Sequence, residues 1–185
     1  MSSSSTTIPA SASAYERATD WRMWVASVAM MVCSWLSYVD RQILAVLSPT
    51  ILSDTHLNAQ SYGEIVSAFS IAYMLANPIW GAVLDYIGLR LGMIAAVLIW
   101  SVASASHAWM AGFMGFALCR ALLGLGEGAT FPGGFRTALD SLSPDRQARG
   151  MAISYSGGSL GAIFAPVVVV PVAAAFGWRA AFLVT

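Results

Sequence analysis

The amino-acid sequence predicts an all-α membrane protein, a bundle of membrane-spanning helices. Of its 185 residues, 58% are hydrophobic and only 10% are charged, with a mean hydropathy of +0.70. About a quarter of the residues in a soluble domain are charged. The apolar residues gather into segments of about 20, the length that crosses a bilayer as a helix. The formal net charge is zero, so we expect no nucleic-acid partner.

The expected elements follow one another along the chain. Residues 1–20 are rich in Ser, Thr and Ala and contain no long apolar core, which predicts a disordered tail rather than a signal peptide. Five spanning helices are expected next, at residues 23–47, 62–84, 91–108, 110–131 and 151–176. A sixth helix begins in "RAAFLVT" and is cut short by the last residue. Residues 21–185 therefore read as helices 1–5 and the start of helix 6 in the amino-terminal part of a longer protein.

The arginines predict the orientation, because cytoplasmic connections carry an excess of positive charge. The basic residues in the connections of one side of the predicted bundle are Arg17, Arg22, Arg90, Arg136, Arg146 and Arg149. The connections of the other side carry Arg179. This asymmetry predicts a multi-pass protein of the plasma (inner) membrane with a cytoplasmic amino terminus.

Small residues predict where helices approach each other closely. Gly124 and Gly128 are four residues apart on the fourth segment, and Gly157 and Gly161 are four apart on the fifth. Such pairs bring helix backbones together in lipid.

Four ionisable residues lie well inside predicted spans, where a charge costs about 2.5–3.5 kcal/mol. Helix 1 carries Asp40 and Arg41, and helix 4 carries Arg120 and Glu127. Arg120, Gly124 and Glu127 share one helical face, whereas Asp40 points about 100° away from Arg41. The four charges could serve only as buried ion pairs that lock helices together. Their number in one bundle favours a pathway for a substrate or a proton.

Two tyrosines accompany these charges. Tyr38 lies on the same face of helix 1 as Arg41, and Tyr73 lies on one face of helix 2 with Asn77. A phenol at membrane depth can donate to an anion, while Tyr and Asn are also common links between helices. The sequence leaves both interpretations open for Tyr73 and Asn77.

Several stretches resemble the major facilitator superfamily. "GAVLDYIGLR" is similar to its Gly-x-x-x-Asp-x-x-Gly signature loop, and "GWRAAF" is similar to its connection between helices 5 and 6. Within the superfamily, "YVDRQIL", "RALLGLGEGATFP", "PDRQARGMAIS" and "SGGSLGAIFAP" resemble the anion:cation symporters, especially the hexuronate and galactonate (sugar-acid):proton symporters. The resemblance covers residues 20–185. It implies a twelve-helix transporter of two six-helix halves, of which this chain supplies the first, truncated in helix 6.

The resemblance also implies roles for individual residues. Arg41 corresponds to the residue that binds the substrate carboxylate, and Asp40 and Glu127 to the residues of proton coupling. The remaining positions expected near the substrate are Tyr38, Tyr73, Arg120, Gly158 and Ser159. Helix 5 of the galactonate relatives offers a Gln at the position that matches Gly158, so glycine favours the hexuronate group or another small organic acid.

The signature loop implies a conformational latch on the cytoplasmic side. The positions that match it are Gly81, Asp85, Gly88 and Arg90, while Tyr86 departs from the usual basic residue. A turn built on the two glycines, with a solvated Asp85, would give the same pattern without a latch.

These observations together predict a proton-coupled symporter of a small organic anion, a hexuronate or related sugar acid. The alternatives are a uniporter, a symporter of an aromatic or dicarboxylic acid, and a non-transporting fragment. We expect no enzyme, because His56 and His107 fall in predicted external connections without a partner motif. No cofactor or metal is expected either, since Cys33 and Cys119 offer no ligand spacing. The expected partners are the anion, the proton, the lipid bilayer and the carboxy-terminal half of the same protein.

Overall fold

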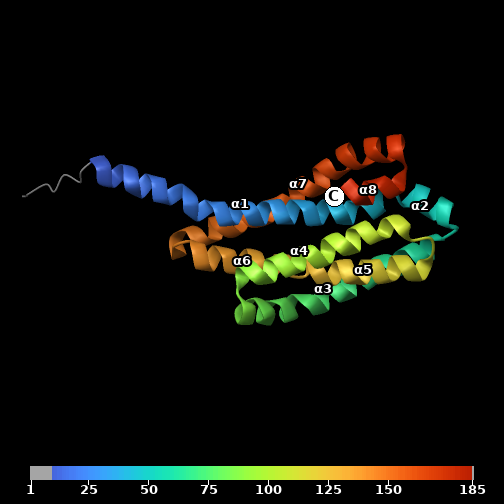
Figure 1. Cartoon of the computed structure of the whole chain (residues 1–185), viewed down its shortest axis with the longest axis horizontal. Helices are drawn as coiled ribbons and strands as arrows, with labels where there is room; N and C mark the ends of the chain where they lie inside the picture. The colour runs from blue at the N-terminus through green and yellow to red at the C-terminus, as the bar shows by residue number, and fades with distance from the viewer. Residues whose placement is uncertain (1–9, 185) are drawn as a thin grey trace, which may run out of the picture.

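The computed structural model describes the backbone of residues 10–184 and the side chains of residues 21–184. Of the predicted disordered tail, residues 1–20, the first nine lie outside the described residues, and the backbone of residues 10–20 is helical and belongs to α1. The described chain is helical throughout, and its helices lie side by side along the long axis of the molecule (Figure 1). The elements are α1 (Ala10–Val46), α2 (Ser48–Thr55), α3 (Ala59–Ile87), α4 (Leu89–Ser106), the 3-10 helix η1 (His107–Trp109), α5 (Phe113–Glu127), α6 (Thr130–Ser141), α7 (Pro144–Phe176) and α8 (Trp178–Val184).

Four of the five complete spans predicted from the sequence are single long helices, namely α1, α3, α4 and α7. The fourth span differs from the expectation of one helix over residues 110–131. It consists of α5 and α6 in series, separated by a turn at Gly128 and Ala129, and it continues to Ser141. Pro132 accounts for the interruption, because it has no N–H to donate to the carbonyl of Gly128. The amide of Ala129 bonds instead to the carbonyl of Gly126, three residues back.

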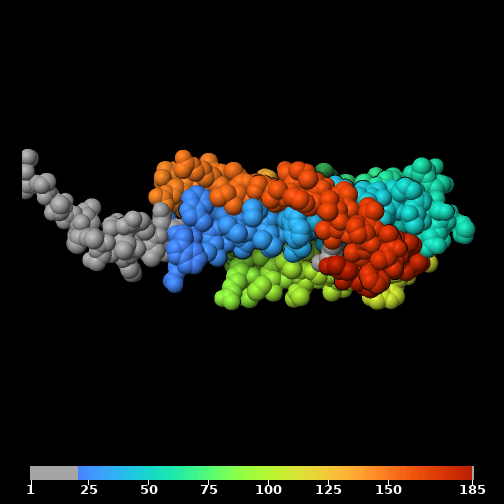
Figure 2. Space-filling model, turned by 90° about the horizontal axis from the view of Figure 1, so that it is seen from above, coloured from blue at the N-terminus to red at the C-terminus, as the bar shows by residue number. Residues whose placement is uncertain are grey.

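The closest helix pairs are α1 with α7 and α3 with α5. Figure 2 shows α1 and α7 running alongside one another over one face of the molecule. A Cβ on Gly157 would overlap the backbone carbonyl of Met31, and one on Gly161 would lie 2.6 Å from the carbonyl oxygen of Trp35. The absence of a side chain at both glycines therefore sets how closely α7 approaches α1.

The two ends of the bundle differ in charge and in connections. At the end that we call the Arg-rich end, α3 turns into α4 and α6 turns into α7 (Figure 1); it carries Arg22, Arg90, Arg136, Arg146 and Arg149. The turn from α3 to α4 is the single residue Gly88, whose φ of 85° favours glycine. The opposite end, the α2 end, carries α2, η1 and the turn from α7 to α8 at Gly177.

Two apolar clusters fill the interior, and a polar layer lies between them. The cluster toward the α2 end contains Ala108 and Phe116, and the cluster toward the Arg-rich end contains Ala103 and Leu123. Along α5, Arg120 falls between Phe116 and Leu123. The buried polar residues near this level are Ser34, Ser37, Asp40, Ser104, Arg120, Glu127 and Thr130.

Large apolar side chains also cover the outside of the bundle. Those on α4 include Leu91, Leu98 and Val102, each more than 60% exposed. Four described helices are long and apolar enough to cross a membrane: α1 from Trp21, α3, α4 with η1, and α7. An apolar exterior around a polar interior layer is the arrangement expected of helices in lipid. The chain is therefore an integral membrane protein.

At the α2 end, Asp54 joins α2 to α8. Its Oδ2 accepts a hydrogen bond from Nε1 of Trp178 at 2.9 Å and one from Nη1 of Arg179 at 3.0 Å. Trp178 is itself buried against Phe116 and Phe182. The donors Trp178 and Arg179 hold the pKa of the Asp54 carboxyl below its usual range.

We predict that Gly157→Ala destabilises the protein by about 1–3 kcal/mol, because the new Cβ pushes α7 away from the backbone of α1. The thermal unfolding midpoint of the detergent-solubilised protein measures the effect. Gly63→Ala is the matched control, since a Cβ on Gly63 of α3 meets no atom within 4 Å and alanine favours the helix. An equal loss of stability in both variants would contradict the close-approach argument.

We also predict a pH-dependent contribution of Asp54 to stability. A carboxyl whose pKa is lowered by folding stabilises the protein above its unfolded pKa, about 3.9, and loses this contribution as the pH falls further. Asp54→Asn should therefore unfold at a lower temperature than the unsubstituted protein at pH 7, and the two midpoints should converge below about pH 3.9. Glu64→Gln serves as control, because Glu64 is exposed and its hydrogen bond joins it to Gln60 on the same helix. A midpoint difference that persists undiminished at pH 3 would refute the assignment.

Candidate functional site

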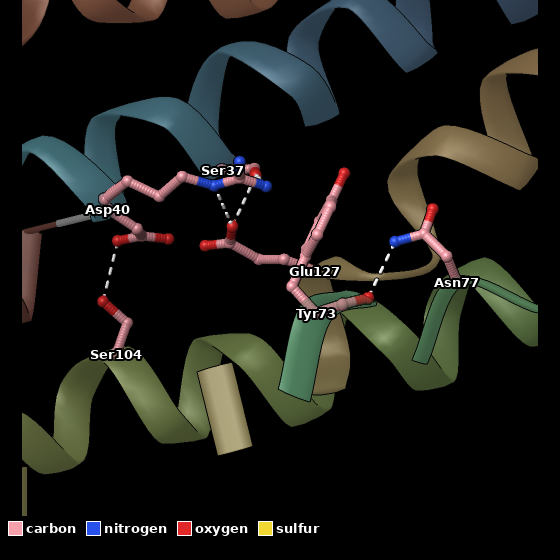
Figure 3. A network of polar contacts seen from close by, with 7 residues as sticks. Ser37, Asp40, Tyr73, Asn77, Ser104 and Glu127 are labelled. Carbon is pink, nitrogen blue, oxygen red and sulfur yellow. Dashed lines mark hydrogen bonds and ion pairs between the residues drawn. The ribbon is translucent and has the colours of Figure 1, made fainter. Parts of the chain in front are cut away.

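Asp40 and Arg41 are neighbours on α1, yet their side chains reach different helices. Asp40 accepts a hydrogen bond from the hydroxyl of Ser104 on α4 at 2.7 Å. Arg41 donates from Nε to Oε2 of Glu127 on α5 at 2.6 Å. Figure 3 shows the carboxyl of Asp40 directed toward Ser104 and that of Glu127 directed toward the helix that carries Ser37. The separation of about 100° between consecutive helical residues is the reason for this divergence.

The Arg41–Glu127 ion pair lies inside the bundle. Glu127 is fully buried, while the side chain of Arg41 keeps 22% of its surface exposed. The hydroxyl of Ser37 donates to the same Oε2 at 2.8 Å and accepts from Nη2 of Arg41 at 3.3 Å. Oε1 of Glu127 has no hydrogen-bond partner among the described residues. One carboxylate oxygen therefore receives two donors, and the other oxygen receives none from the described chain.

Three aromatic rings surround the guanidinium of Arg41. Its Cζ lies 4.8 Å from the ring centroid of Tyr38, 4.9 Å from that of Phe69 and 4.6 Å from that of Tyr73. Cations are attracted to the faces of aromatic rings at these distances, and more strongly where water is excluded. The rings therefore help to hold a positive charge at membrane depth. Phe69 was not singled out from the sequence, although it lies one turn before Tyr73 on the same face of α3.

Tyr73 and Asn77, noted as a pair in the sequence, have different contacts. Asn77 donates from Nδ2 to the backbone carbonyl of Tyr73 at 2.8 Å, a contact within α3 (Figure 3). The ring of Tyr73 faces Arg41. The two residues therefore do not bond to each other through their side chains, and Tyr73 alone reaches the charged site.

A second polar group lies deeper in the bundle and includes Asp40, Ser104 and Arg120. Asp40 and Arg120 are 2% and 3% exposed. Nε and Nη2 of Arg120 have no hydrogen-bond partner within residues 21–184. Arg41, rather than Arg120, makes the direct ion pair with Glu127. Gly124, on the face between the two charges of α5, lies against the backbone of α3 at Phe69.

A cavity of about 260 Å³ opens beside the Arg41–Glu127 pair, between α1, α3, α6 and α7. Three of its lining residues, Tyr38, Arg41 and Tyr73, were predicted to contact a substrate. The others were missed, because apolar or hydroxylated residues give no signal until the helices are placed. The complete lining is Ser34, Tyr38, Arg41, Tyr73, Thr130, Phe131 and Tyr155.

Gly158 and Ser159, two of the predicted substrate positions, do not line this cavity. A Cβ on Gly158 would lie 2.7 Å from the ring of Tyr38, so the tyrosine covers the position where a longer side chain would stand. Ser159 is exposed on the other side of α7. Arg120 also lies outside the cavity lining.

Asp85, at the Arg-rich end, forms an ion pair with Arg136 of α6. Arg136 also contacts Asp140 on its own helix, with 3.2 Å between Nε and Oδ2. Of the other residues predicted for the latch, Gly88 makes the turn from α3 to α4, Gly81 lines a hollow between α3 and α6, and Arg90 is exposed. The sequence did not identify Arg136 as the partner of Asp85, because 51 residues separate them.

A larger hollow of about 830 Å³ lies at the α2 end, around Asp54, His56 and Arg179. It is lined by residues of α2 and of the α7–α8 turn, away from the buried charges. Burial, charge and enclosure coincide in the smaller cavity beside Arg41, which is therefore the candidate functional site.

Comparison with known proteins gives one family. Residues 30–185 match the model of the Major Facilitator Superfamily. The chain is 30% identical over 164 residues to a galacturonate transporter of Dickeya chrysanthemi, covering 88% of this chain and 47% of that protein. It is 29% identical to a hexuronate transporter of Escherichia coli K12, covering 88% of this chain and 38% of that protein. The chain thus spans about half or less of the length of these curated relatives, which are transporters rather than enzymes.

The fold is also found among solved structures. The crystal structure of a bacterial homolog of the human lysosomal transporter Spinster, in an inward-facing and occupied conformation, superposes with a TM-score of 0.75 at 19% sequence identity. The match covers 85% of this chain and 40% of that one. At this identity the likeness concerns the fold alone.

Proposed function

Because the chain belongs to the Major Facilitator Superfamily, we propose that it is the amino-terminal half of a secondary transporter that carries a hexuronate or related sugar acid together with protons. The observation that carries the proposal is the ion pair between the buried Glu127 and Arg41, which lines a cavity. The names of the galacturonate and hexuronate transporters to which the chain is similar support the choice of substrate class.

The ion pair supplies a physical basis for coupling. A substrate carboxylate and the carboxylate of Glu127 compete for the same guanidinium, since Arg41 already gives Nε to Glu127. Protonation of Glu127 removes its negative charge and weakens this contact, which leaves the planar donor fork of Arg41 to the substrate. Loss of the proton on the other side of the membrane restores the ion pair and expels the anion. Asp40, held by Ser104, is the second proposed proton site.

Alternating access needs a gate as well as a site. We place the Arg-rich end in the cytoplasm, following the excess of arginine there. The Asp85–Arg136 ion pair joins α3 to α6 at that end. It is the proposed latch, with Arg136 as the arginine that pairs with Asp85.

The proposal predicts proton-driven uptake by the full-length protein. In proteoliposomes with an acidic exterior, labelled galacturonate should accumulate above equilibration, and a protonophore should abolish the accumulation. Glu127→Gln, which preserves shape but cannot ionise, should exchange galacturonate across the membrane without accumulating it. Glu64→Gln, an exposed substitution on α3, is the control.

Three results would contradict this proposal in different ways. Equilibrative uptake by the unsubstituted protein would identify a uniporter. Inhibition by aromatic or dicarboxylic acids alone would identify another substrate class. No uptake of any carboxylate would overturn the proposal altogether.

Arg41→Lys should lower galacturonate uptake by about tenfold or more, because lysine keeps the charge but loses the two-donor fork. Initial rates of uptake, normalised to the amount of protein in the membrane, measure the effect. Arg149→Lys is the matched control, since Arg149 is exposed at the Arg-rich end. Equal rates in the two variants would show that no carboxylate depends on the fork of Arg41.

A further inference from the structure

Two residues that line the cavity carry hydroxyls with no hydrogen-bond partner in the described part of the chain. Ser34 on α1 and Thr130 at the start of α6 are 3% and 7% exposed and line the same cavity as Arg41. Neither side-chain oxygen has a hydrogen-bond partner within residues 21–184. Buried polar groups are almost always paired, and an unpaired one calls for an explanation such as a missing ligand.

Three other buried hydroxyls of the bundle are paired, which makes these two informative. Ser37 donates to Glu127 at 2.8 Å, Ser104 donates to Asp40 at 2.7 Å, and Ser154 donates to the carbonyl of Gly150 at 2.9 Å. A third unpaired hydroxyl, that of Ser27, lies two turns before Ser34 on α1 and does not line the cavity. Unpaired hydroxyls from two different helices thus meet at the cavity that Arg41 lines.

The two hydroxyls lie along the same cavity as the guanidinium of Arg41. Ser34 precedes Arg41 by two helical turns on one face of α1, and Nη2 of Arg41 reaches back to Ser37, one turn from Ser34. Thr130 follows Glu127 by three residues, across the turn between α5 and α6. A molecule whose carboxylate rests on Arg41 therefore extends along α1 toward Ser34 and Thr130.

The rest of the wall is aromatic. Phe131 and Tyr155 stack with ring centroids 5.4 Å apart, and the hydroxyl of Tyr155 donates to the carbonyl of Phe131 at 2.8 Å. Tyr38 closes the wall over Gly158, where no other side chain can stand beside it. A few placed polar groups among aromatic surfaces are typical of a site that orients a small ligand. The flat C–H faces of a sugar ring pack on such rings, while its hydroxyls need partners.

We propose that Ser34 and Thr130 form a hydroxyl-binding subsite that makes the cavity selective for carboxylates bearing several hydroxyl groups. This inference rests on the proposed function and adds the residues that recognise the part of the substrate remote from the carboxylate. A site built to bond a substrate hydroxyl rejects an analogue that lacks it, because its own polar groups then stay unpaired.

Two substitutions in the full-length protein test the subsite. Ser34→Ala and Thr130→Val remove one hydroxyl each with little change in volume. We measure inhibition of labelled galacturonate uptake by unlabelled galacturonate and by tetrahydropyran-2-carboxylate, which keeps a ring and a carboxylate but has no ring hydroxyls. Each variant should raise the half-inhibiting concentration of galacturonate about tenfold, and that of the deoxygenated acid should stay unchanged. The double variant should bring the two acids to similar values.

Matched controls separate this effect from a general loss of packing. Ser27→Ala removes the unpaired hydroxyl outside the cavity, and Thr137→Val removes a buried threonine two turns further along α6. Both should keep the preference for galacturonate. Thr130→Ser, which retains the hydroxyl, should keep it as well. If Ser34→Ala or Thr130→Val does not reach the membrane, the inhibition measured with the other variant tests the subsite.

The possible failures are distinguishable. If the unsubstituted protein takes up galacturonate and both test variants retain its affinity, the subsite is overturned and the proposed function stands. If the variants weaken both acids equally, the hydroxyls only support packing and the subsite is again overturned. If the unsubstituted protein binds no sugar acid, the proposed function fails and the subsite fails with it.

Discussion

The ion pair between Arg41 and Glu127 is the constraint on which the rest of the structure depends. A buried charge is tolerated only with a close partner, and removing one partner of such a pair leaves the other uncompensated. Glu127 is fully buried, so the side chain of Arg41 must extend from α1 to α5 at this level. The rings of Tyr38, Phe69 and Tyr73 then enclose the guanidinium. This ion pair links the helices, and an incoming anion would have to compete with Glu127 for Arg41. The same contact therefore serves both stability and binding.

Close helix packing makes this contact possible. The glycines of α5 let it lie close to α3 and α4, and those of α7 let it lie close to α1, so the bundle that surrounds the ion pair is compact. Two apolar clusters flank the polar layer. Low polarity around the layer strengthens each of its interactions and raises the cost of leaving any group unpaired.

The sequence predicted what depends on one helix at a time. The segment lengths predicted five spans, of which four are single long helices, and consecutive positions on a helix predicted that Asp40 and Arg41 diverge. Contacts between residues on different helices could not be predicted from the sequence. The partners of Arg41, Asp40 and Asp85 lie on other helices, at sequence separations of 86, 64 and 51 residues. Nothing in the sequence distinguishes Ser34, Thr130 and Tyr155 from other helical residues, because only the packing of the helices brings them to one cavity. The fourth span, expected over residues 110–131, is instead α5 followed by α6, which continues to Ser141.

The turn between α5 and α6 has a mechanical consequence. Glu127 is the last residue of α5, and Arg136 lies within α6, about 9 Å beyond the turn at 1.5 Å per residue. Pro132 removes one backbone hydrogen bond at this turn. The turn can therefore act as a hinge between Glu127 on α5 and Arg136 on α6, which pairs with Asp85. Tilting α6 by about 10° would displace Arg136 by about 1.5 Å, enough to strain its contact with Asp85 while leaving α5 undisturbed.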